Sequence, residues 1–239
     1  MPRFFTSNIG DGRIVIDGAD ANHIGRTLRM RPGDAVTVCD GTGTDYACVI
    51  ETIRPDFVEL TIESSAPSLS EPAVAVHLFV GMPKADKAEH IVQKAVELGA
   101  ASVNFFDCRF CVSKPADFDK RRVRLERVAL EAAKQSGRGK IPELGGLLTF
   151  DEMLAAVKKT DLPILFYEGG GEALRRILER PFDTCALITG PEGGFSAEEV
   201  EKAKAAGIVT ATLGPRILRC ETAPLCAASA VLFQKGALD

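Results

Sequence analysis

The chain has 239 residues, of which 46% are hydrophobic and 26% charged, and its formal net charge is −4 at pH 7. This length suits one large domain or a small domain joined to a medium one, and the composition is that of an ordinary globular protein. No segment approaches the roughly 18 uninterrupted apolar residues of a membrane span, and no apolar leader follows the first residue, so we expect a cytoplasmic protein.

Short runs of Val, Ile, Phe and Thr with partial alternation open the chain and predict strands. Separated by turns that contain Gly, Asp or Pro, they occupy residues 3–7, 13–17, 35–40, 45–53 and 57–63. This spacing favours a small antiparallel β-barrel, interrupted by one short helix at 21–30. The Ser- and Pro-rich segment 64–72 predicts a linker, so we place the domain boundary after residue 72.

The chain from 73 to 239 alternates apolar and amphipathic runs, which predicts an α/β domain with a mostly parallel sheet. About five strands are expected, at 74–80, 102–106, 163–167, 185–188 and 209–213. Helices are expected between them, at 86–99, 120–136, from about 151, at 172–180, after 196 and after 222. Ser196 with Glu199 predicts a capping box, and Thr222 followed by Pro224 predicts the cap of the last helix.

Two of these strands, 185–188 and 209–213, end in glycine-containing turns. The first turn reads T-G-P-E-G-G at 189–194, and the second begins with G-P at 214–215. Because glycine has no Cβ, a ligand can approach the backbone of such turns closely. Neither turn matches G-x-G-x-x-G or G-x-x-x-x-G-K-[ST], which disfavours a Rossmann dinucleotide site and a P-loop. The two turns therefore predict a pocket for a flat or anionic ligand.

The chain has seven cysteines, an odd number that predicts reduced thiols rather than a disulfide framework. Cys108 and Cys111 have C-x-x-C spacing, but no second pair completes a zinc site and the three histidines stand far apart. A redox role has no further support in the sequence. We therefore interpret the pair as thiols at the end of a strand, and we expect no metal.

Charge is unevenly distributed along the chain. Residues 1–72 hold 6 Lys and Arg against 11 Asp and Glu, whereas residues 114–140 hold 9 against 4. The second segment is thus locally basic, and such a patch can contact nucleic-acid phosphates in a protein that is acidic overall. The alternative interpretation is a solvated helix face.

Two motifs near the C-terminus resemble the signature of the 16S rRNA uracil-N3 methyltransferases of the SPOUT class. They are G-P-E-G-G at 190–194 and L-G-P-R-I-L-R-C-E-T-A-P at 213–224. Further similar segments are K-A-D-K at 84–87, Q-K-A-V-E-L-G at 93–99, E-A-A-K-Q-S-G-R at 131–138 and H-I-G-R-T-L-R-M-R-P-G-D at 23–34. The resemblance spans nearly the whole chain, and the segment 107–114 departs from it.

The resemblance implies a PUA-like, RNA-binding β-barrel at 1–72 and a SPOUT methyltransferase domain at 73–239 with a C-terminal trefoil knot. It also implies a homodimer that uses S-adenosyl-L-methionine to methylate N3 of one uridine of 16S rRNA in the 30S subunit. Three strand ends would hold this cofactor, through Leu165, Phe166, Tyr167, Glu168, Thr189, Gly190, Pro191, Gly193, Gly194, Leu213, Gly214, Ile217, Leu218 and Arg219.

Methylation at N3 requires that the imide proton leave and that the negative charge on the O2–N3–O4 edge be stabilised. Arg219 and Arg216 are the candidates for stabilisation, because a guanidinium stays charged and matches a planar oxygen edge. Glu192 or Glu221 would accept the proton, directly or through water. A structural salt bridge beside Thr222 is an equally good role for Glu221.

Basic and polar side chains in both predicted domains are candidates for contact with RNA. They are Arg3, His23, Arg26, Arg29, Arg31, Lys84, Lys94, Arg121, Arg122, Arg124, Gln135 and Arg138. Two alternative functions stay open: a SPOUT methyltransferase that acts on tRNA, and a ribosome-binding assembly factor without turnover.

Overall fold

The computed structural model describes residues 2–84, 86–113 and 117–238; Ala85 and Lys114, which belong to segments compared above, lie outside these ranges. The chain divides into two compact units. The first consists of Met1–Glu71 and Ala133–Ile141, and the second of Pro72–Ala132 and Pro142–Asp239. The segment Ala133–Ile141, which the sequence analysis assigned to the second domain, therefore belongs to the first unit.

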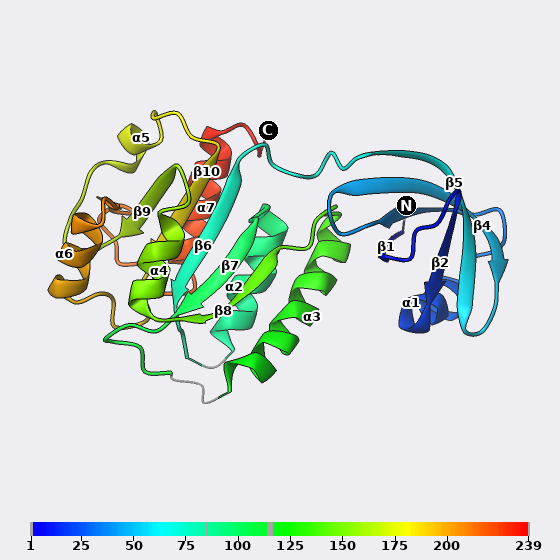
Figure 1. The fold of residues 1–239 in the computed structure, drawn as a ribbon, viewed down its shortest axis with the longest axis horizontal. Coiled ribbons are helices and arrows are strands. Elements are labelled where there is room, and N and C mark those ends of the chain that lie inside the picture. Colours follow the sequence, from blue (N-terminus) through cyan, green and yellow to red (C-terminus); the bar gives the residue numbers. More distant parts are fainter. Residues whose placement is uncertain (1, 85, 114–116, 239) are drawn as a thin grey trace. The chain divides into compact units, whose positions relative to one another are not determined.

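The first unit contains a five-stranded mixed sheet with the strand order β1-β3-β4-β5-β2 (Figure 1). Its strands are β1 (Arg3–Phe5), β2 (Arg13–Asp17), β3 (Ala35–Cys39), β4 (Thr44–Ile53) and β5 (Phe57–Pro67). The pairing of β1 with β3 is parallel and the others are antiparallel. Alternate side chains such as Ile14, Val36 and Leu60 are fully buried and form the core, as the alternating pattern predicts.

Three features of this unit differ from the prediction. The pairing of β1 with β3 is parallel, whereas an antiparallel barrel was expected. The helix begins earlier than expected, as α1 (Gly18–Asn22), and continues as a π-helical turn at His23–Thr27. Strand β5 extends to Pro67, because residues 64–67 pair with the start of β4. The predicted linker at 64–72 is therefore too long, since its Ser-rich first half finds a partner strand that local composition cannot indicate.

Glu71 and Arg138 form a buried ion pair within the first unit. Arg138 Nη2 lies 2.7 Å from Glu71 Oε2, and the side chains are only 4% and 13% exposed. The amides of Gly139 and Lys140 also donate to Glu71. Burial by itself raises the pKa of Glu71, but the contacts with Arg138 and these amides outweigh it and lower the pKa below its ordinary value.

The second unit contains a six-stranded parallel sheet with the order β11-β9-β10-β6-β7-β8. Its strands are β6 (Ala75–Gly81), β7 (Ser102–Phe106), β8 (Glu143–Leu148), β9 (Leu162–Phe166), β10 (Thr184–Thr189) and β11 (Val209–Ala211). The chain's remaining helices are α2 (Lys87–Leu98), α3 (Phe118–Ser136), α4 (Phe150–Val157), α5 (Leu174–Ile177), α6 (Ala197–Ala205) and α7 (Ala223–Gln234). This architecture confirms the predicted α/β class.

Strand β8 is the one strand of this sheet that the sequence analysis missed. Its sequence, E-L-G-G-L-L, contains two glycines and no β-branched residue, so it lacks the usual strand composition. A Cβ on Gly145 would collide with the side chain of Asn104 on β7. The glycine therefore permits β8 to lie against a neighbour that the local sequence does not reveal.

The capping interactions are only partly as predicted. Ser196 and Glu199 form the expected capping box at the start of α6. Thr222 occupies the N-cap position of α7 with Pro224 in the first turn, but its side chain makes no capping hydrogen bond, so that part of the prediction is wrong. The backbone of Thr222 is already in the helical region, which turns the side chain away from the geometry of a cap.

The strand order places the carboxyl ends of three neighbouring strands at one edge of the sheet. Strand β9 lies between β10 and β11 and is parallel to both, so the turns that follow all three strands meet there. Helix α7, red in Figure 1, packs against β6, β10 and α2. Among the described residues, no helix combines the length and apolar character needed to cross a membrane.

Replacing Glu71 by alanine leaves the buried Arg138 guanidinium without its carboxylate. We expect the free energy of unfolding at pH 7 to fall by about 3–5 kcal/mol, measured by urea denaturation. Asp119→Ala, which removes an exposed partner of Arg122, is the matched control and should cost less than about 1 kcal/mol.

The same contact predicts a pH dependence. Because the pKa of Glu71 is lower in the folded chain than in the unfolded chain, its stabilisation is complete above the ordinary glutamate pKa. It should be lost as the pH falls through the folded value. A stability difference between wild type and Glu71→Ala that stays constant on acidification would contradict the assignment.

Candidate active site

A cavity of about 640 Å³ opens at the sheet edge where β9, β10 and β11 end. It brings together nearly all the residues that the resemblance assigned to a cofactor. The exception is Leu165, which is fully buried in β9. The sequence analysis missed five other lining residues, namely Lys87, Phe195, Thr212, Cys220 and Ala223.

Several turns that line this cavity contain glycine, because their backbones pack closely against neighbouring atoms. A Cβ on Gly190 would lie 3.1 Å from the Cα of Gly194, and one on Gly194 would lie 3.0 Å from Glu168 Oε1. Gly194 and Gly214 also have positive φ angles, +66° and +91°, which favour glycine. The turns thus keep their close packing and present main-chain atoms to the cavity.

Polar and apolar groups of the cavity suit a ligand that has both characters. Thr189 is 1% exposed, and its hydroxyl has no hydrogen-bond partner among the described residues. An unpaired buried hydroxyl is costly, so a ligand atom that pairs with it would be favoured. At the rim, Ile217 is 86% exposed and could cover an apolar ring together with Leu218. These features fit a nucleoside-like ligand with a flat face and a polar edge.

Lys87, at the start of α2, links two of the cavity's turns. Its ammonium lies 3.1 Å from Glu192 Oε1 and 3.1 Å from Glu221 Oε2. The amide of Lys84 also donates to Glu192. The hydrogen bonds to Glu221 and Glu192 raise the pKa of Lys87, so this side chain stays charged. It therefore joins the turn after β10 to the segment before α7.

The two candidate proton acceptors are both held as anions. Burial alone would raise their pKa values, but backbone hydrogen bonds and Lys87 outweigh it, and the pKa values of Glu192 and Glu221 are lower than usual. Burial raises the pKa of the Cys220 thiol to about 12, and its hydrogen bond to Glu221 adds to the effect. The cluster therefore carries one positive and two negative charges.

The two candidate arginines lie on the turn after β11 and line the cavity. The side chain of Arg219 is 84% exposed, and Arg219 Nη1 lies 4.0 Å from Glu221 Oε1. Arg216 is exposed as well. Both guanidinium groups can therefore meet a substrate that approaches the cavity from solvent.

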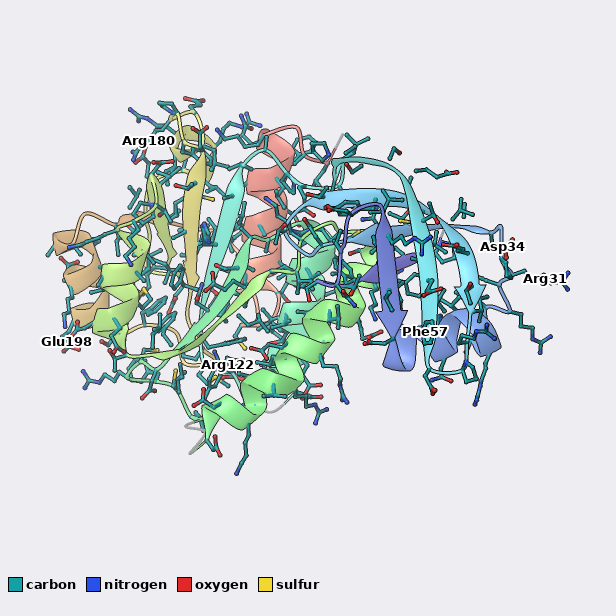
Figure 2. The ribbon with its side chains drawn as sticks, turned by 45° about the vertical axis from the view of Figure 1, so that its right-hand side comes forward. Arg31, Asp34, Phe57, Arg122, Arg180 and Glu198 are labelled. Carbon is teal, nitrogen blue, oxygen red and sulfur yellow. The ribbon has the colours of Figure 1, made fainter. Side chains whose placement is uncertain are left out.

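Several candidate RNA contacts are exposed in the first unit, where His23, Arg26, Arg29 and Arg31 lie in or just after the π-helical turn. Figure 2 shows Arg31 extending away from the ribbon. Gln135 is exposed too.

Arg138 was wrongly assigned to RNA, because it is buried against Glu71. Arg3 is also engaged within the protein, since both of its terminal nitrogens bond to Asp45, at 2.8 and 2.9 Å. It is therefore removed from the set of candidate RNA contacts.

The other candidates lie in the second unit. Lys84 is exposed, and Lys94 pairs with Glu97 at 2.8 Å. On α3, Arg124 bonds to Glu89 at 2.8 Å, Arg122 lies near two acidic neighbours, and burial lowers the pKa of Arg121. These partners leave α3 less cationic than its sequence suggests. No group of His, Cys, Asp and Glu in the described part of the chain is arranged to hold a metal ion.

Comparison with known proteins gives matches along both units. The family described as RNA methyltransferase domain matches residues 70–232, and that described as RNA methyltransferase PUA domain matches residues 16–63. The ribosomal RNA small subunit methyltransferase E of Bacillus subtilis is 35% identical over 228 residues, which are 92% of this chain and 89% of that protein. Its namesake from Mycobacterium bovis is 29% identical over 225 residues, 91% of this chain and 85% of that protein.

Solved structures give the same result. The crystal structure of a ribosomal RNA small subunit methyltransferase E from Neisseria gonorrhoeae, bound to S-adenosyl methionine, has a TM-score of 0.86 and 27% identity. The match covers 98% of this chain and 97% of that one. The family match covers more than half of the chain, and the Bacillus subtilis relative is more than 30% identical. The chain therefore belongs to the RNA methyltransferase family.

Proposed function

We propose that this chain transfers a methyl group from S-adenosylmethionine to N3 of one uridine of 16S rRNA in the 30S subunit. The observation that carries the proposal is the cavity formed by three strand-end turns, in a chain whose relatives are named small subunit rRNA methyltransferases. A homologous structure with this fold is bound to S-adenosyl methionine. The cytoplasm, where ribosomal subunits are found, is the expected place of action.

The cavity's residues fit this cofactor. The glycine turns at 190–194 and 213–214 would hold it through main-chain atoms, and Thr189 offers an unpaired hydroxyl. Ile217 and Leu218 would cover the adenine. When bound, S-adenosylmethionine supplies an electrophilic methyl group on a positively charged sulfonium. The net negative charge of the cluster of Lys87, Glu192 and Glu221 suits a cation nearby.

Arg219 and Arg216 would stabilise the uracil imide as it ionises, since their charged donors match the planar O2–N3–O4 edge. A proton acceptor works best when its pKa is near the working pH. The lowered pKa values make Glu192 and Glu221 weak bases, so either carboxylate would receive the proton, directly or through a bridging water, only as the arginines stabilise the imide anion. Lys87 would act by positioning these two carboxylates.

The first unit would bind RNA as a PUA-like domain whose strands curl into a barrel. The match to an RNA methyltransferase PUA domain supports this role, as does the exposure of His23, Arg26, Arg29 and Arg31. The exposed residues Lys84 and Gln135, the half-buried Lys94 and the basic start of α3 would supply further RNA contacts. Phosphate contacts of this kind give affinity without sequence selection.

Two finer features follow from the family resemblance. A C-terminal trefoil knot is supported by the position of β9 between β10 and β11 and by the return of α7 to β6 and β10. A homodimer is supported by Cys226 and Phe233, which lie two turns apart on one exposed face of α7. We expect light scattering to give twice the mass of the chain.

The proposed reaction is tested by methyl transfer from radiolabelled S-adenosylmethionine to 30S subunits that lack the modification. We expect label in 16S rRNA, at a uridine whose N3 methylation is confirmed by mass spectrometry. Unmodified tRNA is the parallel substrate. Label in tRNA alone would favour the alternative substrate, and no label in either would favour an assembly factor.

Arg219→Ala removes a charged donor from the turn after β11. We expect kcat to fall at least about a hundredfold because the ionised imide loses a stabilising partner. Calorimetry should show a nearly unchanged Kd for S-adenosylmethionine, since the guanidinium is exposed. Arg175→Ala, an exposed arginine on α5 outside the cavity, is the control. Turnover of Arg219→Ala near that of the control would exclude Arg219 from the mechanism.

Lys87→Ala leaves Glu192 and Glu221 without their shared cation. Their pKa values should rise, because each would face another carboxylate with less compensation. We therefore expect the acidic limb of the pH–rate profile to move to higher pH, and Lys87→Arg to restore it. An unchanged limb in Lys87→Ala, with folding verified by circular dichroism, would show that Lys87 does not position these groups.

A further inference from the structure

The segment after β7 brings the two thiols of the C-x-x-C motif into contact. Cys108 Sγ and Cys111 Sγ are 3.5 Å apart, and both residues are 6% exposed. The amide of Cys111 donates to the carbonyl of Cys108 at 3.0 Å, which closes a turn between them. Such a turn keeps its end Cα atoms within about 7 Å, inside the range that a disulfide accepts.

The two residues between the cysteines contact the cofactor side of the second unit. Phe110 lies against Gly193, where a Cβ would stand only 2.6 Å from Phe110 Cβ. The amide of Arg109 donates to Glu199 at 2.8 Å, and its guanidinium bonds to Glu198, which Figure 2 labels on α6. The segment between the thiols is therefore attached to the glycine turn and to the start of α6.

We propose that Cys108 and Cys111 are a dithiol–disulfide pair whose oxidation changes the affinity of the adjacent cavity for its ligand. Closing the Sγ–Sγ distance from 3.5 Å to the roughly 2 Å of a disulfide must rearrange the turn that carries Arg109 and Phe110. Movement of Phe110 changes the support of Gly193, which lines the cavity. The effect on S-adenosylmethionine rests on the function proposed above, whereas the pairing of the thiols does not.

Cys111 is the attacking thiol of the pair. The two thiols share a hydrogen bond in which either can donate, and the amide of Cys108 donates to the Cys111 sulfur. These contacts with Cys108 lower the pKa of Cys111. Cys111 also lines a surface hollow with Arg109, Phe110, Val112 and Gly193, which gives a small reagent a path to it. Within the described residues no further ligands surround the pair to form a metal site.

The oxidant is a small disulfide such as glutathione disulfide. The Cys111 thiolate attacks one of its sulfurs, forms a mixed disulfide and releases one glutathione thiolate. Cys108, losing its proton to solvent, then attacks the Cys111 sulfur of the mixed disulfide and releases the second glutathione. The protein loses two protons and two electrons, and the glutathione disulfide is reduced to two thiols.

The test uses the full chain in a Cys226→Ser background, which removes the exposed cysteine. The protein is equilibrated with reduced and oxidised glutathione in varied ratio, and peptide mass mapping follows each state. We expect the oxidised protein to contain a Cys108–Cys111 linkage. Calorimetry should then give a Kd for S-adenosylmethionine changed about tenfold relative to the reduced protein.

Cys108→Ser and Cys111→Ser, made singly in the same background, are the matched controls. Each should keep the affinity of the reduced protein and form no intramolecular linkage. Cys111→Ser should not react with glutathione disulfide, whereas Cys108→Ser should stop at the mixed disulfide on Cys111. Absence of the linkage at every ratio would overturn the proposal, as would a linkage that leaves the affinity unchanged. If neither state binds the cofactor, the proposed function fails instead. Hydrogen exchange of residues 190–200 then decides the coupling, because a difference between the two states supports it and equal exchange overturns it.

Discussion

The parallel pairing of β9 with both β10 and β11 is the constraint on which the rest of the second unit depends. It brings three strand ends to one edge, where each strand must turn away through a short segment with free main-chain groups. The strands that lead to this edge are packed in the core, where Ile164 and Leu187 are fully buried. The turn after β10 is glycine-rich because a Cβ on Gly193 would collide with Phe110 and because Gly194 has a positive φ. The space the turns leave is a preformed site, and a ligand need not reorganise the sheet to enter it.

Charged side chains next to these strand-end turns connect the cavity to the chemistry of methyl transfer. Lys87 comes from the first turn of α2, far along the chain from Glu192 and Glu221, and its ion pairs join the segments that carry the two carboxylates. A shared cation keeps two neighbouring carboxylates charged, which would otherwise raise each other's pKa values. The arginines on the turn after β11 remain exposed toward solvent, where a substrate would arrive. The cavity is therefore lined both by the anionic Glu192, which is paired with Lys87, and by two exposed arginines.

The first unit shows why the number of basic residues in a sequence is a poor guide to its positively charged surface. Arg138 and Arg3 belong to basic or N-terminal segments that read as candidate contacts, yet both are held by carboxylates inside the unit. A buried cation without a partner is costly, so such residues bring their own acidic partners with them. Arg26 and Arg31, in contrast, project from the surface. Fewer basic side chains are consequently available to solvent than the sequence contains, and several of the exposed ones lie in or just after the π-helical turn.

The amino-acid sequence by itself determined the α/β class, the order of most elements and the capping box at Ser196, because these depend on hydrophobic period and on residues close together in the chain. It also located the glycine turns, and the motif resemblance indicated their ligand. Strand β8, the burial of Arg138 and the contacts of Lys87 were decided only by the tertiary structure. Each of these depends on a partner distant in sequence. The same holds for the contact of Phe110 with Gly193, because side-chain proximity across elements leaves no periodic signal in a single chain.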